Sequence, residues 1–494
     1  MLRTKDWISL LSCSLLMSIA SNIQNVRSAQ AAVLVNNLVI PGESTDLATG
    51  SGVNTNRLGG FFSDLYYDRY QNLYYGLVDR GPGGGTISYN TRVEKFSLNV
   101  DAKTGAIADF KLLDTILLTN NGSNYNGLNP KLLNGDSSKL GLSLDPEGFT
   151  VAPNGNFYIA DEYGPSINEF SPSGSLVRSF TTPNNLLPKD ATGLNYVDGR
   201  PTLISGRQDN RGFEGVTLSP DGSKLFALLQ APLVNEGDTP GSPDGRRSRN
   251  LRLVEFDTKT GKSTGQYIYQ VEDISTINDR IPGTTNDFTA TQQGRSIGIS
   301  AITALNNSEF LVLERDNRGI GVDDPLGTNP IGTKRVYKIS LDGATNVSDT
   351  SLAGTNALPV GINAVSKSLF LDIADALTTS GQRIPEKIEG LAIGPQLSDG
   401  SYALLLGTDN DFSVTQNGSN VQFDVCTNGT TIPLGSGCPA GSTLIPTYLY
   451  SFKASGAELK GFVPPAKVPE PAAAIGLTLV AVGAFGLKRK SIVQ

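Results

Sequence analysis

Acidic side chains recur beside short apolar runs along this chain, in positions that suit cation binding or proton transfer. Glu147, Glu214 and Glu389 each precede a glycine and a run of β-forming residues. Carboxylates that lie close together raise one another's pKa unless a cation neutralises them. We therefore predict that these glutamates are catalytic, and that a second group of acids, each near the end of another apolar run, binds Ca²⁺ through oxygen ligands. The second group is Asp79, Asp161, Glu162, Glu314, Asp316, Asp409 and Asp411.

Arginine side chains stand close to several of these acids. Arg80 follows Asp79, Arg211 precedes Glu214, and Arg315 lies between two acids of the second group. A guanidinium group suits bidentate binding of phosphate or carboxylate, so we predict that these arginines belong to the site. The alternative for each is an ion pair with a carboxylate that ties neighbouring sheets together.

Several kinds of chemistry are excluded by composition. The chain has 494 residues and no histidine, whereas a Ser-His-Asp hydrolase, a histidine-ligated zinc site and a phosphohistidine phosphatase all need an imidazole. Any catalysis must use carboxylates, Arg, Lys, Tyr, Ser or a hard metal with oxygen ligands. The net charge of -7 and the pI near 5.0 argue against nucleic acid as a partner, because no basic stripe can replace phosphate counterions.

The elements that carry the acids are predicted to be β-hairpins. One pattern occurs five times: a small or acidic pair, a short β run, a turn, a second β run and a polar end. Asn154-Gly155, Asp221-Gly222 and Asp399-Gly400 are strong hairpin signals, because both turn positions favour positive φ. Strand patterns between these units would complete four-stranded sheets.

An all-β chain of repeated four-stranded sheets favours a β-propeller. The units begin farther apart than the usual blade period of about 40 to 50 residues, so long loops or unrecognised blades must fill the intervals. We predict six blades, with five or seven as alternatives, and a two-domain β-sandwich as the alternative fold. Inner strands would gather the three glutamates near a central channel, but strand direction must decide whether the second group of acids shares their face.

Residues 1–31 have the features of a secretory signal peptide. Arg3 and Lys5 precede an apolar stretch over residues 7–19, and the small-x-small site Ala29-Gln30-Ala31 comes directly before Ala32. This order is typical of a cleaved signal. The alternative is a membrane anchor, for which the apolar stretch is short. We predict export and a mature chain that begins at Ala32.

Residues 463–494 are predicted to form a sorting and anchoring segment. Pro469-Glu470-Pro471 precedes an apolar stretch over about 472–487 and the basic tail Lys488-Arg489-Lys490. This order resembles a PEP-CTERM sorting signal. The resemblance implies processing by an exosortase-type enzyme, in bacteria that make extracellular polysaccharide. The alternative is an ordinary C-terminal transmembrane anchor, and both place the basic tail in the cytoplasm and the body outside.

The cysteines agree with export. Cys13 lies within the predicted signal peptide, which leaves Cys426 and Cys438 in the mature chain. Such a pair in an exported protein is predicted to form a disulfide that closes a surface loop. At this loop length the bond would stabilise the fold by roughly 2 to 3 kcal/mol.

Five phrases between about Leu58 and Phe452 carry a family resemblance. They are Asp145-Pro146-Glu147-Gly148-Phe149, Asp161-Glu162-Tyr163-Gly164, Gly212-Phe213-Glu214-Gly215-Val216, Glu314-Arg315-Asp316 and Lys387-Ile388-Glu389-Gly390-Leu391. In these phrases the chain resembles the phytase-like, or esterase-like phytase, domain family. The resemblance implies one propeller domain over residues 32–462 and hydrolysis of a phosphoester or ester at the cell surface. Propeller phytases use calcium, so it also implies a Ca²⁺ cofactor.

On this resemblance, bound Ca²⁺ is expected to polarise a phosphate and orient a water, with Glu147 or Glu214 as general base and arginines balancing the developing charge. Two alternatives stay open. One is a non-catalytic surface propeller that binds polysaccharide or protein in the extracellular matrix. The other is a calcium-dependent lactonase-like esterase. Catalysis is therefore a hypothesis that the sequence does not decide.

Overall fold

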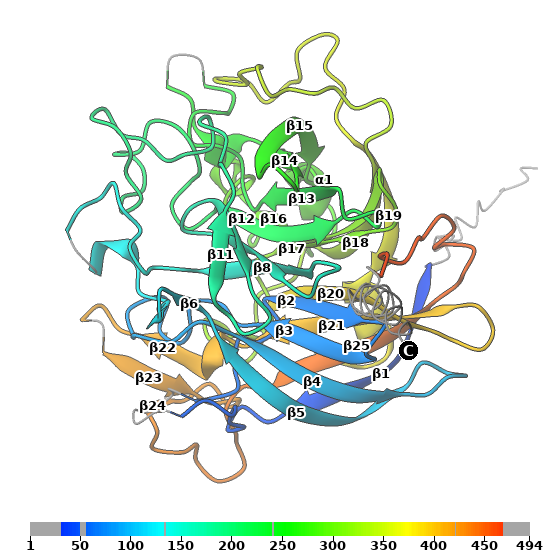
Figure 1. Cartoon of the computed structure of the whole chain (residues 1–494). Helices are drawn as coiled ribbons and strands as arrows, with labels where there is room; N and C mark the ends of the chain where they lie inside the picture. Colours follow the sequence, from blue (N-terminus) through cyan, green and yellow to red (C-terminus); the bar gives the residue numbers. More distant parts are fainter. Residues whose placement is uncertain (1–30, 50–55, 133–134, 240–241, 420, 468–494) are drawn as a thin grey trace, which may run out of the picture.

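The computed structural model describes residues 31–49, 56–132, 135–239, 242–419 and 421–467. These residues are mostly β and contain five four-stranded antiparallel sheets. Their innermost strands contact one another in a closed ring, which gives the radial arrangement of a β-propeller (Figure 1). In ring order the inner strands are β2 (Asp64–Asp68), β8 (Pro146–Val151), β12 (Phe213–Leu218), β16 (Ile297–Ala304) and β20 (Lys387–Gln396).

Each inner strand is followed outward by three more strands. The first sheet continues with β3 (Leu73–Leu77), β4 (Arg92–Val100) and β5 (Ile107–Leu117), and the second with β9 (Phe157–Asp161), β10 (Ser166–Phe170) and β11 (Leu176–Ser179). The third sheet continues with β13 (Lys224–Leu229), β14 (Asn250–Asp257) and β15 (Lys262–Gln270), and the fourth with β17 (Glu309–Asp316), β18 (Lys334–Ser340) and β19 (Ser366–Asp372).

The fifth sheet is built from both ends of the described chain. Its order is β20, β21 (Tyr402–Asp409), β25 (Thr447–Ala454) and β1 (Ala32–Ile40). Strand β1 pairs antiparallel with β25 from Ala32 opposite Ala454 to Ile40 opposite Thr447. The first strand of the described chain therefore completes a sheet whose other strands come from its last part.

The preferred number of six blades is not supported, because the described residues form five four-stranded sheets. The long intervals in the sequence contain loops and small elements instead of another blade. These are the strands β6 (Thr119–Asn120), β7 (Ser123–Asn124), β22 (Val414–Gln416), β23 (Gln422–Val425) and β24 (Thr431–Pro433), the α-helices α1 (Ile274–Asn278) and α2 (Ile373–Thr379), and the 3-10 helices η1 (Pro130–Leu132), η2 (Gly245–Arg247), η3 (Ala290–Gln292) and η4 (Asp411–Ser413).

The hairpin turns form where the sequence predicts them. Gly155 and Gly222 take φ values of +87° and +74°, a region that glycine enters without steric cost. Apolar side chains of neighbouring sheets pack between them, as where Phe226 of the third sheet meets Phe310 of the fourth at a ring-centroid distance of 4.7 Å. The core therefore lies between the sheets.

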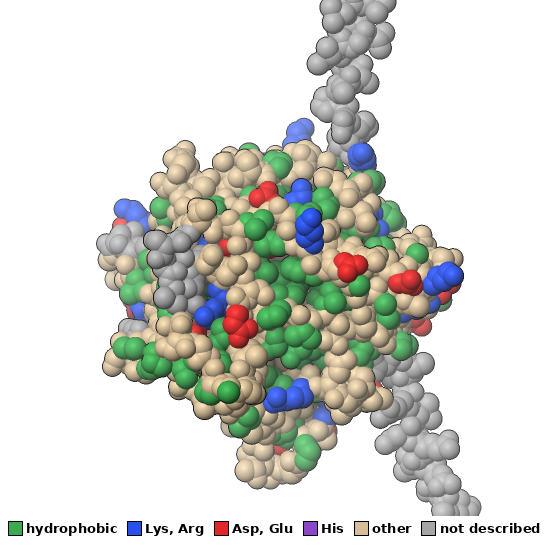
Figure 2. Space-filling view, turned by 90° about the horizontal axis from the view of Figure 1, so that it is seen from below, with side chains coloured by type: hydrophobic (Ala, Val, Ile, Leu, Met, Phe, Trp, Pro, Cys, Tyr) green, Lys and Arg blue, Asp and Glu red, His purple; other side chains and the backbone are tan. Residues whose placement is uncertain are grey.

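The inner strands run in the same direction, from one mouth of the central channel to the other. At the mouth where they end, apolar residues such as Val216 and Leu391 surround a small cavity that Phe462 and Val463 also line. The chain is held there because the Val463 amide donates to the carbonyl of Leu305 at 2.7 Å. The described chain thus leaves the propeller at this apolar mouth. On the face drawn in Figure 2, hydrophobic side chains gather near the centre, with charged side chains scattered around them.

Both predicted end segments lie largely outside the described residues. The signal peptide over 1–31 overlaps the structure only at Ala31, whose amide donates to the carbonyl of Phe370 at 3.1 Å. The C-terminal segment over 463–494 overlaps it at 463–467, and the predicted membrane stretch at 472–487 lies outside. Among the helices that the structure describes, none is long and apolar enough to cross a bilayer.

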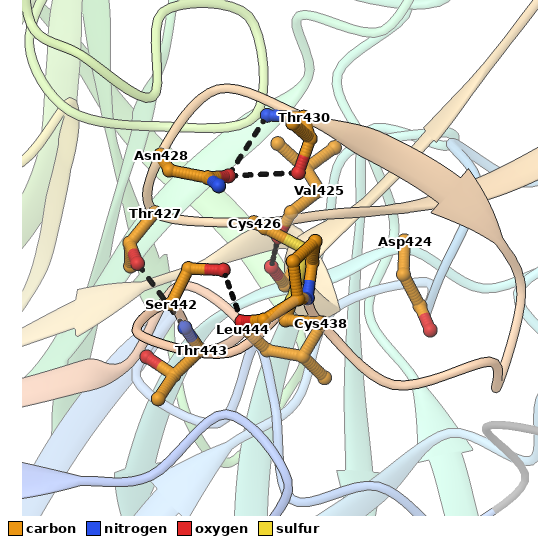
Figure 3. The surroundings of a disulfide bond; sticks show 12 residues. Asp424, Val425, Cys426, Thr427, Asn428, Thr430, Cys438, Ser442, Thr443 and Leu444 are labelled. Carbon is orange, nitrogen blue, oxygen red and sulfur yellow. Dashed lines mark hydrogen bonds between the residues drawn. A yellow bond between two sulfur atoms is a disulfide. The ribbon is translucent and has the colours of Figure 1, made fainter.

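Cys426 and Cys438 form a disulfide, which closes a loop that follows β23 (Figure 3). Their Cα atoms lie 5.9 Å apart, within the normal range for such a bond. Cys426 is fully buried, and its amide donates to the carbonyl of Thr430 at 2.9 Å. The bond therefore fixes one end of the loop against the body.

Candidate active site

The hairpin geometry brings the two groups of acids to one mouth of the channel. In each sheet the start of the inner strand pairs with the end of the second strand, as where Pro146 lies opposite Asp161 and Lys387 opposite Asp409. Glu147, Glu214 and Glu389 stand near the starts of β8, β12 and β20. The direction of the strands, which the sequence left open, thus places both groups at the same end of the propeller.

A cavity of about 440 Å³ opens at this mouth, a volume typical of small-molecule sites. It is lined mainly by polar and charged side chains from all five sheets. Nine of the thirteen predicted catalytic and metal residues line it, namely Asp79, Arg80, Glu147, Glu162, Arg211, Glu214, Arg315, Glu389 and Asp411.

Asp79 is the centre of an acidic cluster beside this cavity. Its carboxylate forms a group with those of Asp145 and Glu147, and another group with those of Asp409 and Asp411. Within each group, oxygen atoms of the three residues lie within 4.8 Å of one another. Burial raises the pKa of Asp79 well above its ordinary value, and the charge of Asp409 raises it further. A divalent cation would relieve this repulsion.

Two glutamates keep unpartnered oxygens in the cavity. Among the described residues, Oε2 of Glu214 and Oε2 of Glu389 are buried and accept no hydrogen bond. Burial raises the pKa of Glu214 well above its ordinary value, and the negative charge of Glu162 adds to the effect. Buried acceptors without partners are costly, so both atoms suit contact with a proton donor or a cation.

Glu147 is the third glutamate and lies half-buried in the cavity. Its carboxylate accepts no hydrogen bond from any residue that the structure describes. Burial raises its pKa well above the ordinary value, and Asp145 and Glu214 raise it further through their charges. The raised pKa values of Glu147 and Glu214 therefore favour an added proton or cation at these two glutamates.

Arg80 and Arg315 connect neighbouring sheets, as the alternative interpretation of the arginines proposed. Arg80, beyond β3, donates to Oδ2 of Asp145 at 2.9 Å, just before β8. Arg315, on β17, pairs with Glu389 on β20 and donates to Oγ of Ser300 at 2.7 Å. Both also line the cavity, so they hold carboxylates of the site in place.

Lys387 was not among the predicted site residues, yet it balances part of the cluster. Its Nζ lies 2.9 Å from Oδ2 of Asp409 and 2.6 Å from Oδ1 of Asp411. Burial alone would lower its pKa, but the two aspartates raise the pKa well above the ordinary value. Lys387 is therefore a fixed positive charge that pairs with two of the three acids in its group. In the group of Asp79, Asp145 and Glu147, Arg80 pairs with Asp145 alone, so this group is the better place for a metal ion.

Four predicted metal ligands do not line the cavity, and three of these stabilise the fold. Asp161 holds the turn after β9, where it accepts the amides of Asp145 at 3.0 Å and Gly164 at 2.9 Å. Glu314 accepts the hydroxyl of Tyr269 at 2.8 Å and pairs with a lysine on the opposite side of its strand from the cavity. The carboxylates of Asp161 and Glu314 therefore stabilise the fold.

Asp316 is the third of these, and it forms a fully buried ion pair with Lys334 at 2.9 Å. It also accepts the amides of Gly332 and Thr333 at 2.6 and 2.9 Å. Side chains alternate between the faces of a strand, so Glu314 and Asp316 turn away from the cavity that Arg315 enters. Asp409, the fourth predicted residue that does not line the cavity, still belongs to the acidic cluster.

Several site residues were missed by the sequence reasoning. Asp145 and Lys387 stand two residues before Glu147 and Glu389 in recognised phrases, and Gln230 follows an apolar run as the predicted acids do. These positions carried a usable signal. Asn210 and Arg295 lie in loops and carried none. Gly83 and Gly84 also line the cavity.

A family model described as "Phytase-like: Esterase-like activity of phytase" matches residues 56–412. The chain belongs to the phytase-like family. The predicted resemblance is thereby confirmed for the body of the chain. In this phytase-like chain the matched range includes the three glutamates and the whole acidic cluster, up to Asp411.

Other comparisons show more distant similarity. A protein of Arthroderma benhamiae named "Uncharacterized secreted protein" is 26% identical over 445 residues, which cover 74% of this phytase-like chain and 84% of the relative. The Dos1 propeller is similar at 10% identity and a TM-score of 0.27, over 80% of this chain and 68% of that one. PQQ-bound aldose sugar dehydrogenase from Streptomyces coelicolor is similar at 13% identity and a TM-score of 0.27, over 85% and 95%. At such TM-scores these structures carry no argument about function.

Proposed function

We propose that the chain is an exported hydrolase of phosphoesters or esters, and that the cavity at the acidic mouth is its active site. The observation that carries this proposal is the set of buried glutamates with unpartnered oxygens, Glu214 and Glu389, in a cavity that arginines also line. The carboxyl group of Glu214, whose pKa is raised by burial, is suited to proton transfer in such a cavity. The family description, which names an esterase-like activity of phytase, agrees with this chemistry.

Glu147 and Glu214 are proposed to divide the proton transfers between them. Glu147 belongs to the group with Asp79 and Asp145, where a bound cation would favour its carboxylate form and let it accept a proton from water. Glu214 lies outside that group and accepts a hydrogen bond from Gln230. Its raised pKa favours the carboxylic acid, which can protonate the leaving oxygen.

Calcium is the proposed cofactor, held by Asp79, Asp145 and Glu147. These residues offer only oxygen atoms, which Ca²⁺ prefers. Burial and the charge of Asp409 raise the pKa of Asp79, and only Asp145 of the three has an ion-pair partner among the described residues, Arg80. When bound, the ion would polarise an oxygen of the substrate. The arginines would orient the anionic part of that substrate and balance charge that develops on it.

The proposal is tested by hydrolysis assays with the purified protein on phytate, a simple phosphomonoester and a short acyl ester, with calcium or with chelator. We expect activity that chelator removes and calcium restores, and that Glu147→Gln and Glu214→Gln each lower by about 100-fold or more. Asp342→Asn, at an exposed loop position, is the matched control and should leave activity unchanged.

The outcomes separate the proposed function from its alternatives. Phosphate release from phytate or the monoester identifies a phosphoric-ester hydrolase. Acyl-ester hydrolysis without phosphate release identifies the lactonase-like esterase instead. If folded, calcium-loaded protein is inactive on all three substrates, the hydrolase proposal fails and the surface-binding propeller takes its place.

We also propose that the protein is exported and held at the cell surface. Two predicted segments support this, a signal peptide over residues 1–31 and a sorting segment over 463–494. The similarity to a protein named as secreted supports export. The described chain leaves the propeller at the apolar mouth, while the cavity opens at the other. An anchor on the C-terminal side would therefore leave the cavity facing away from the membrane. Processing by an exosortase-type enzyme is part of the same proposal.

A further inference from the structure

We propose that Arg211 and Arg295 form an anion subsite that binds the phosphate group of the substrate. This inference rests on the proposed function and names the part of the cavity that recognises the charged group. Arg295 was not predicted from the sequence, and it lines the same cavity as Arg211. The two side chains are 24% and 33% exposed, so solvent and ligands reach both.

These two arginines are more weakly paired with carboxylates than Arg80 and Arg315, the other arginines that line the cavity. Arg211 lies 3.5 Å from the nearest carboxylate oxygen of Glu162, and Arg295 lies 3.4 Å from that of Asp209. Arg80, by contrast, has a carboxylate partner at 2.9 Å. Among the described residues, Nε and Nη2 of Arg211 and Nε of Arg295 donate no hydrogen bond. Both guanidinium groups thus keep N–H donors for a ligand.

One loop holds the two guanidinium groups beside each other. Nη1 of Arg211 donates to the carbonyl of Asn210 at 2.5 Å, and Nη1 of Arg295 donates to the carbonyl of Asp209 at 2.8 Å. Adjacent carbonyls therefore anchor both groups. Burial lowers the pKa of Arg295, and the charge of Arg211 lowers it further. Two positive charges held close together favour an anion between them. The oxygens of a phosphate group can accept hydrogen bonds from both guanidinium groups at once.

The position of Arg211 and Arg295 in the propeller would let a substrate bound to them also reach the acidic cluster. Arg211 precedes β12 of the third sheet and Arg295 precedes β16 of the fourth. Asp79 follows β3 of the first sheet and Asp409 ends β21 of the fifth, while Glu147 lies on β8 of the second sheet, next to the third. Glu162, the neighbour of Arg211, also lies 4.0 Å from Arg80, which pairs with Asp145. An anion on the arginine pair would therefore lie in the same cavity as the acidic cluster and beside it.

Calorimetric titration of the purified full-length protein with inorganic phosphate tests the subsite without requiring turnover. We expect the double variant Arg211→Gln/Arg295→Gln to bind phosphate about tenfold or more weakly than the parent, because charge-assisted hydrogen bonds are lost. Its thermal unfolding midpoint should stay close to that of the parent, since neither arginine has a close carboxylate partner. Arg295→Lys keeps the charge without the fork and should recover only part of the affinity.

Arg383→Gln is the matched control, because Arg383 is exposed, donates only to backbone carbonyls such as that of Leu326 and does not line the cavity. It should bind phosphate like the parent. The inference is overturned if the parent does not bind phosphate or if the double variant binds it equally well. A separate hydrolysis assay distinguishes the two proposals: phosphate binding that depends on the arginines, without any hydrolysis, would keep the subsite and reject the hydrolase. Sulfate or acetate binding as tightly as phosphate would also overturn the assignment to phosphate.

Discussion

Strand β17 places three consecutive charged residues in different environments. They are Glu314, Arg315 and Asp316. Arg315 reaches the cavity and pairs with Glu389. Glu314 and Asp316 are both fully buried on the opposite side, where lysines pair with them. The alternation of a strand thus divides a single acidic phrase into one site residue and two residues that stabilise the fold.

Asp316→Asn should destabilise the protein without a direct effect on the site. The change leaves the ammonium group of Lys334 buried without a charged partner, which costs about 3 to 5 kcal/mol. Denaturant unfolding should show this loss, while the folded fraction keeps its activity. Glu309→Gln, in the more exposed pair with Lys338, is the control and should cost less than about 1 kcal/mol. If the Asp316→Asn variant unfolds at the normal denaturant midpoint but has lost activity, then Asp316 takes part in the active site.

Glu214→Gln should remove one limb of the pH profile of kcat. The pKa of Glu214 is raised above its ordinary value of 4.5, so the acid form persists to higher pH. A general acid loses activity as pH rises through its pKa, and the limb on the alkaline side should therefore be absent in the variant. Gln keeps the shape and the neighbour Gln230, so KM should change little. If the residual activity of the variant keeps the same alkaline limb, then that limb belongs to another titrating group.

At the residue scale, the sequence predicted which residues lie near the channel mouth better than it predicted which way their side chains point. The three catalytic candidates could be found because each lies near the start of an inner strand and before a glycine, and because the hairpin turns have clear sequence signals. They are Glu147, Glu214 and Glu389. Whether an acid at the end of a second strand faces the cavity depends on register and on β-bulges, such as the one between Ile388 and Gly390. Arg295 could not be found, because its proximity to Arg211 depends on a long loop that the sequence does not position.

At the scale of elements, we expect the loss of β1 to destabilise the closed ring of sheets. It is the outer strand of the fifth sheet and pairs with β25 over its whole length. A chain truncated to begin at Pro41 would leave the edge of β25 open to pairing with other molecules. We expect a lower thermal unfolding midpoint by calorimetry and aggregates in size-exclusion chromatography.

Val33→Thr is the control for this truncation, because Val33 lies on β1 and is 67% exposed. It should leave both measurements unchanged. If the truncated chain unfolds at the same temperature and stays monomeric, then contacts among the five inner strands alone close the ring. The sequence predicted the hairpins but not this closure, since pairing between the two ends of the chain is not visible in any local pattern.

At the scale of the whole molecule, the acidic mouth makes stability depend on pH. Burial raises the pKa of Asp145 from 3.8 to about 7 and that of Asp409 from 3.8 to about 6, and it raises that of Glu386 from 4.5 to about 7. Between about pH 4 and 7 the folded protein thus holds protons that the unfolded chain has released. Stability falls as pH rises where the native state binds more protons, so without metal these groups should destabilise the protein progressively across this window.

Calcium should reverse this trend, because it binds the deprotonated carboxylates of the folded state and stabilises by mass action. In chelator, the thermal unfolding midpoint should fall from pH 4.5 to 7.5, and the gain on adding calcium should be larger at pH 7.5. Aspartates outside the cavity, such as Asp190, whose pKa is lowered to about 2 by hydrogen bonds from Thr192, titrate below this window. The Asp145→Asn/Glu147→Gln variant should lose most of the calcium gain. A gain that is equal at both pH values, or that survives in this variant, would place the ion elsewhere on the propeller.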